Sequence, residues 1–138
     1  MSYRKVLFLC TGNSCRSQMA EAIVNARLGE TWKAFSAGTK PAGYVHPKAL
    51  ETLRRHGIDA GSPKSQSWDD FADQPFDVVL TVCDSAAAES CPVFPGRAAR
   101  VHWSIPDPAA VTGGEKKVRQ AFEDAFALLR QRIEDELL

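Results

Sequence analysis

Apolar and polar positions alternate along this chain with two different spacings, one typical of strands and one typical of helices. Short apolar runs predict strands at residues 5–9, 33–37, 77–82 and 100–103. Apolar positions that recur every three or four residues, with Pro47 at a helix start and glycines after helix ends, predict helices at 17–28, 47–56 and 115–136. A further short helix is predicted near residues 68–72.

The predicted helix at 115–136 has the clearest period in the chain. Its apolar side chains form one stripe, made by Val118, Phe122, Ala125, Phe126, Leu129, Ile133 and Leu137. Apolar strands that alternate with helices predict the α/β class, here three layers (α/β/α) around a central four-stranded parallel sheet. Ligands bind such sheets at the carboxyl ends of the strands. The length predicts a single domain over residues 1–138.

The loop at residues 10–16, between the first strand and the first helix, combines a nucleophile with an anion site. The N–H groups of such a loop and the positive end of the helix point at one spot, which suits a tetrahedral oxyanion. We expect this environment to lower the pKa of the Cys10 thiol, and Arg16 to bind two oxygens of the anion. The candidate substrate-binding residues are Thr11, Gly12, Asn13, Ser14, Cys15, Arg16 and Ser17. Cys15 is expected to pack beneath the loop.

Two further cysteines could pass a disulfide away from Cys10. Cys83 ends the third predicted strand, so a parallel sheet places it at the same edge as Cys10. Cys91 follows after seven small or polar residues. Thiolate attack could form a disulfide between Cys10 and Cys83, and then one between Cys83 and Cys91. The alternative is that Cys83 and Cys91 are inert thiols.

Asp107 lies between two prolines in a loop after the fourth predicted strand. Flanking prolines stiffen a loop and can hold a carboxyl group over a site, where it would act as a general acid. The alternative is that Asp107 only forms a turn. The three histidines are assigned no chemical role, and His46 is predicted to lie at a helix start.

Composition narrows the possible partners. The chain has 17 basic and 17 acidic residues, and this zero net charge argues against nucleic acid or an anionic membrane surface as a partner. Its apolar runs are far shorter than the ~18 residues that span a bilayer. We expect a cytoplasmic monomer, in which four cysteines indicate redox or catalytic use. Without a C-x2-C pair or a Cys/His cluster, no metal site is expected.

The run from Val6 to Glu21 closely resembles the arsenate reductases of the low-molecular-weight tyrosine phosphatase fold. The likeness continues through Ser36-Ala37-Gly38, His46-Pro47, Gly57-Ile58-Asp59, Asp77-Val78-Val79, Cys83, Cys91-Pro92, His102-Trp103 and Asp107-Pro108. The loop alone fits either the reductases or the phosphatases of that fold. The pair Cys83 and Cys91 favours the thioredoxin-coupled reductases.

The resemblance implies a reaction in which Cys10 attacks arsenic(V) while Arg16 and the loop amides hold the arsenate oxygens. Asp107 would protonate the departing oxygen, and Cys83 would then attack Cys10 and release arsenite. Cys91 would attack Cys83 and present a Cys83–Cys91 disulfide to thioredoxin, the implied electron donor. Asn13 and Ser17 would stabilise the thiolate and hold the loop shape. Phosphate and sulfate would mimic arsenate, and no bound cofactor is implied.

Two departures from the family pattern matter. The seven residues between Cys83 and Cys91 form a slightly longer spacing, so glutaredoxin with glutathione is the second choice of reductant. Some relatives bind potassium at positions that match Asn13, Glu21 and Ser36, completed by a threonine and an aspartate. This chain has Lys64-Ser65-Gln66 at that place, and the Lys64 ammonium could supply the charge, so a potassium requirement is not expected.

Two other functions remain open at this point. A phosphatase of the same fold would hydrolyse phosphate monoesters and would not need Cys83 or Cys91 for turnover. A non-enzymatic oxyanion or arsenite sensor would bind stoichiometrically without forming a product.

Overall fold

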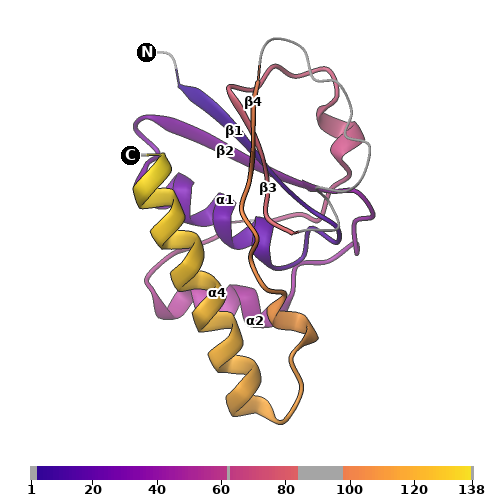
Figure 1. Cartoon of the computed structure of the whole chain (residues 1–138), viewed down its shortest axis with the longest axis vertical. Coiled ribbons are helices and arrows are strands. Elements are labelled where there is room, and N and C mark those ends of the chain that lie inside the picture. The colour runs from indigo at the N-terminus through magenta and orange to yellow at the C-terminus, as the bar shows by residue number, and fades with distance from the viewer. Residues whose placement is uncertain (1–2, 62, 84–97, 138) are drawn as a thin grey trace.

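The computed structural model describes residues 3–61, 63–83 and 98–137 (Figure 1). Cys91 lies outside the described residues, so its predicted place beside Cys83 is not addressed by the structure. The strands are β1 (Arg4–Cys10), β2 (Trp32–Gly38), β3 (Val78–Thr81) and β4 (Ala99–His102). The helices are α1 (Arg16–Arg27), α2 (Pro47–Arg55) and α4 (Glu115–Glu136), with 3₁₀ turns η1 (Trp68–Phe71) and η2 (Pro108–Ala110). Each predicted element is confirmed, with ends that agree within one residue.

The four strands form one parallel sheet in the order β2-β1-β3-β4. Alternate residues of a strand face opposite sides of the sheet. Val6 and Phe8 of β1 accordingly join the larger core cluster, whereas Leu7 and Leu9 join the smaller one. The central position of β1 brings its C-terminal end, at Cys10, between the ends of β2 and β3.

The two faces of the sheet are covered differently. Apolar residues of α1, α2 and α4 belong to the larger cluster, and α4 runs alongside α1 and α2 in Figure 1. In the described parts of the chain, the other face is covered by η1 and the segment after it, through Phe71 and Phe76. The α/β class with a four-stranded parallel sheet is therefore confirmed, and the short helix predicted near residues 68–72 is the 3₁₀ turn η1.

The starts of the helices differ in how their backbone is capped. His46 caps α2, because its Nδ1 accepts a hydrogen bond from the Lys48 N–H at 3.0 Å. This confirms the predicted place of His46 at a helix start. The residue before α1 is Cys15, which makes no side-chain cap, so the first N–H groups of α1 face the loop that precedes it. Among the described helices, none is long and apolar enough to cross a membrane.

Candidate active site

The loop at 10–16 lies at the carboxyl end of β1, and its turn depends on Asn13. Asn13 is fully buried and has a φ of 48°, the left-handed conformation that asparagine tolerates better than most residues. Its Nδ2 donates to Ser17 Oγ at 2.8 Å, and its Oδ1 accepts from the Gln66 N–H at 2.8 Å. The Asn13 side chain therefore joins the start of α1 to a segment some fifty residues later. Ser17 makes this contact as an acceptor.

The carbonyl groups of the loop are bound by the segment that follows β2. Lys40, Ala42 and His46 donate their N–H groups to the carbonyls of Thr11, Gly12 and Ser14 at 2.9, 2.8 and 2.9 Å. With these carbonyls held on one side, loop N–H groups remain available to an anion on the other side. Gly38 makes the close approach possible, since a Cβ there would lie 2.6 Å from the Thr11 carbonyl oxygen.

Arg16 extends from the first turn of α1 toward the loop after β4. Its Nη1 donates to the Ile105 carbonyl at 2.9 Å, and its Nη2 lies 3.8 Å from Asp107 Oδ2. Its Nε is buried and has no hydrogen-bond partner among the residues that the structure describes. A buried, unpartnered donor on a permanently charged group costs free energy unless a ligand satisfies it. This arrangement suits an oxyanion at the loop.

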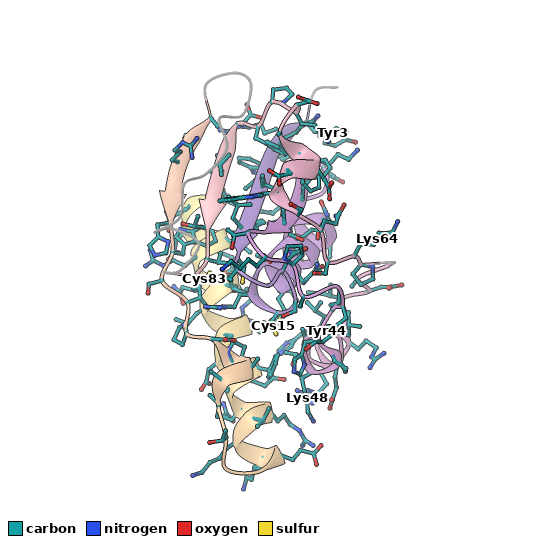
Figure 2. All side chains as sticks on the ribbon, turned by 90° about the vertical axis from the view of Figure 1, so that its right-hand side faces the viewer. Tyr3, Cys15, Tyr44, Lys48, Lys64 and Cys83 are labelled. Carbon is teal, nitrogen blue, oxygen red and sulfur yellow. The ribbon has the colours of Figure 1, made fainter. Side chains whose placement is uncertain are left out.

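Cys83 lies beside Cys10, as its position at the end of β3 predicted. Both thiols are buried, with 2% and 4% of their residue surface exposed. The Thr11 N–H donates to Cys83 Sγ at 3.2 Å, and Thr11 Oγ1 is 3.4 Å from the same sulfur. Thr11 therefore contacts the second thiol, although the sequence placed it only against the anion. Cys83 and Cys15, both of them buried, are labelled in Figure 2.

The pKa of the Cys10 thiol depends on its neighbour Cys83. The hydrogen bond with Cys83, followed by burial, raises the pKa of the Cys10 thiol, whereas Arg16 and the Asn13 N–H lower it. Two sulfurs in hydrogen-bond contact do not readily both ionise, because the second thiolate would form beside the first. The prediction of a lowered pKa for Cys10 is wrong for the paired thiols, since it left out the second sulfur.

Cys15 is buried beneath the loop, where the sequence placed it. Its Sγ lies 3.6 Å from Ser14 Oγ, and it belongs to the larger core cluster. Burial raises the pKa of the Cys15 thiol to about 11. Cys15 is therefore protonated near neutral pH and is a weaker nucleophile than a thiolate would be.

Asp107 forms a turn, which is one of the two roles that the sequence left open. Its Oδ1 accepts from the Ala109 N–H at 3.0 Å and so caps the short turn η2. Its other carboxyl oxygen faces Arg16 at 3.8 Å, with 43% of the side chain exposed. Asp107 is thus a turn former whose free oxygen points toward the anion site.

The residues behind the loop do not fit a potassium ion. Both lone pairs of Asn13 Oδ1 are occupied, by the Gln66 N–H and by the Gln18 amide nitrogen at 3.1 Å. The described residues contain no group of three His, Cys, Asp or Glu side chains that could hold a metal ion. Lys64 is exposed and extends away from the protein in Figure 2. Its carbonyl, not its ammonium group, faces the site, which corrects the role predicted for it.

Glu21 lies on α1 behind the loop, beside a polar cavity of about 280 Å³ that Gln18, Asp59 and Lys64 also line. Burial raises the pKa of its carboxyl group to about 7, and the hydrogen bond that Ser36 Oγ donates to it at 2.7 Å opposes that rise. Glu21 is therefore largely protonated below neutral pH.

Replacing Glu21 with glutamine should stabilise the protein at pH 8 and have little effect at pH 5. A carboxyl group with a pKa of about 7 when folded, against an ordinary pKa of 4.5, holds an extra proton in the folded state between these limits. Its contribution to the free energy of unfolding then falls as pH rises through that window, by at most about 3 kcal/mol. Urea unfolding of both proteins at several pH values measures the difference. The exposed Glu30→Gln variant is the control, and a parallel pair of pH profiles would contradict the expectation.

Comparisons with known proteins agree with this geometry. The family model for low molecular weight phosphotyrosine protein phosphatases matches residues 5–137. The arsenate reductase of Bacillus licheniformis is 39% identical over 137 residues, which is 99% of this chain and 91% of that protein. A solved arsenate reductase in a phosphate-binding state has a TM-score of 0.76 and 26% identity, covering 96% of this chain and 95% of that one. A thioredoxin-dependent arsenate reductase of Corynebacterium glutamicum has a TM-score of 0.66 and 28% identity, covering 96% of this chain and 61% of that one.

The sheet order, the Cys-x5-Arg loop and the family match define the class of protein. This chain belongs to the low-molecular-weight phosphotyrosine protein phosphatase family. The resemblance to arsenate reductases of that fold is confirmed by relatives that carry this name.

Proposed function

We propose that this protein reduces arsenate to arsenite through the thiols of Cys10, Cys83 and Cys91, with thioredoxin as the electron donor in the cytoplasm. The observation that carries the proposal is the buried contact between Cys10 and Cys83 beside Arg16. Hydrolysis of a phosphate ester at Cys10 does not require a second thiol at the nucleophile. Reduction requires a second thiol, because two electrons must reach arsenic, and Cys83 beside the nucleophile can supply it.

The first step uses the anion loop and the residues around it. Arsenate binds to the loop N–H groups and to Arg16, whose buried Nε gains an acceptor. The Cys10 thiolate attacks arsenic, and Asp107 gives its proton to the oxygen that leaves as water. The product is an arsenic(V) adduct on the Cys10 sulfur. The remaining predicted substrate-binding residues, from Thr11 to Ser17, support the loop in this step.

The paired thiols set the order of the two attacks. While Cys10 is a thiolate, a second thiolate on Cys83 is disfavoured. Once the Cys10 sulfur is bonded to arsenic, the negative charge lies on the arsenic-bound oxygens and no longer on that sulfur. Cys83 can then ionise, with Thr11 N–H and Oγ1 beside its sulfur. Cys83 then attacks Cys10 Sγ. A disulfide forms, the sulfur–arsenic bond breaks, and its electron pair leaves with arsenite.

Cys91 completes the cycle. Its thiolate attacks Cys83 Sγ, forming a Cys83–Cys91 disulfide and releasing the Cys10 thiolate. Thioredoxin then reduces that disulfide. The name of the related thioredoxin-dependent reductase supports this donor, and glutaredoxin with glutathione is the alternative that the longer Cys83–Cys91 spacing keeps open.

The test is arsenite production from arsenate with thioredoxin, thioredoxin reductase and NADPH, for the wild type and for Cys91→Ser. We expect steady turnover by the wild type and about one arsenite per protein molecule from the variant. Steady turnover by both proteins would indicate that the electron donor attacks Cys83 directly, and would favour glutathione as the donor. Hydrolysis of p-nitrophenyl phosphate without any arsenite would make the protein a phosphatase, and stoichiometric arsenate binding without a product would make it a sensor.

A further inference from the structure

Gln18 lies directly behind the anion loop, and the proposed reaction does not use its side chain. It occupies the first turn of α1 and is 3% exposed. Its Nε2 lies 3.1 Å from the Asn13 carbonyl oxygen, 3.1 Å from Asn13 Oδ1 and 2.7 Å from the Lys64 carbonyl oxygen. All three neighbours accept hydrogen bonds, so the atom that faces them is the amide nitrogen and not the amide oxygen.

The three oxygens come from two segments that are far apart in the sequence. Two belong to Asn13, the loop residue in the left-handed conformation, and one belongs to the segment at 64–66. The same segment also binds the loop through Ser65 Oγ, which donates to the Gly12 carbonyl at 3.1 Å. The Gln18 amide nitrogen therefore connects the loop with the segment at 64–66. Three acceptor oxygens around one point repel each other unless a donor or a cation lies between them.

Asn13 also connects this point to the nucleophile, because its N–H bonds to the Cys10 sulfur. The Asn13 carbonyl lies in one plane with the Ser14 N–H, so a shift of the carbonyl also turns that N–H. Such a rotation would move this loop N–H group away from the anion. The contacts of Gln18 thus act on the anion site through Asn13.

We infer that Gln18 is a positioning residue, whose amide nitrogen holds Asn13 so that the loop binds oxyanions. This inference deepens the proposed function, since it concerns the same anion site. It also explains why Asn13 Oδ1 does not fit potassium: the N–H groups of Gln18 and Gln66 already bind this oxygen. The wild-type protein should therefore bind anions equally well in sodium, potassium and choline salts.

The test measures sulfate binding by calorimetry, which does not depend on arsenate reduction. Gln18→Met keeps the length of the side chain and removes the donor, and Gln18→Glu keeps the shape but places an acceptor against three acceptors. We expect both variants to bind sulfate at least about tenfold more weakly. In the arsenate assay the KM should rise by a similar factor while kcat changes less than about threefold. Gln120→Met, at an exposed glutamine of α4, is the matched control.

A donor-bearing variant separates positioning from simple packing. Gln18→Lys brings an ammonium group to the same three oxygens and should restore sulfate binding to within about threefold of the wild type. This variant also decides the matter if Gln18→Met does not fold. The inference fails if Gln18→Met binds sulfate as the wild type does, if the lysine and methionine variants are equally weak, or if wild-type binding requires potassium. A wild type that binds no sulfate in any salt would overturn the anion site itself, and with it the proposed function.

Discussion

Replacing Cys83 with serine should abolish arsenite formation while leaving phosphate ester hydrolysis at Cys10 largely intact. The serine hydroxyl is nearly the size of the thiol and can still accept from the Thr11 N–H. It cannot form a disulfide, so the arsenic adduct on Cys10 receives no electron pair from the protein. We expect less than one arsenite per protein molecule with thioredoxin, against continuous turnover by the wild type.

The contrast between the two cysteine variants makes this prediction specific. Cys91→Ser still has Cys83 and should release one arsenite before it stops, whereas Cys83→Ser should release none. Hydrolysis of p-nitrophenyl phosphate by the Cys83→Ser variant shows that its loop is folded. Its rate should also peak at a lower pH than in the wild type, because the neighbouring sulfur no longer raises the pKa of Cys10. Continuous arsenite production by Cys83→Ser with thioredoxin alone would contradict the relay.

Replacing Arg16 with lysine should lower kcat/KM for arsenate by about a hundredfold or more, a loss typical of removing a donor to a developing oxyanion. Lysine keeps the charge but has neither Nε nor a second terminal nitrogen. Its single ammonium group cannot bond to Ile105, approach Asp107 and bind the anion together as the guanidinium does. Initial rates over a range of arsenate concentrations measure the loss, and sulfate inhibition should weaken as well.

The control for Arg16→Lys is Arg132→Lys. Arg132 is an exposed arginine of α4 that pairs with Glu136 of that helix. That change should alter kcat/KM by less than about twofold. If Arg16→Lys also stays within about threefold of the wild type, the planar guanidinium group has no part in holding the anion. The loop amides alone would then account for binding.

The architecture could be predicted because each main element carries its own periodic signal. The stripe from Val118 to Leu137 marks α4 along its whole length, and the apolar run that ends before Cys83 places this residue at the edge of the sheet beside Cys10. The likeness to a known family adds the expected chemistry. The roles of Cys91 and Asp107 stay predictions.

The support behind the loop could not be predicted in the same way. The segments at 39–46 and 64–66 are irregular, and they hold the loop mainly through backbone N–H and carbonyl groups, which are the same in nearly every residue type. The pairing of Cys10 with Cys83 also changes the direction of a pKa shift that the loop alone predicts. The positioning role of Gln18 is indicated in the sequence only by its place in the first turn of a helix that begins at an anion site.

The bonds that Lys40, Ala42 and His46 make to the loop carbonyls tie formation of the site to completion of the sheet. These bonds exist only after β2 has paired with β1, so an unfolded chain offers no equivalent anion site. A ligand that binds only the folded chain raises the free energy of unfolding, by about 2.7 kcal/mol at a hundred times its Kd. Phosphate, which has nearly the shape of arsenate, would then slow proteolysis of this protein while competing for its site. The lifetime of the protein in a cell would rise with the phosphate supply at the same time as its activity falls.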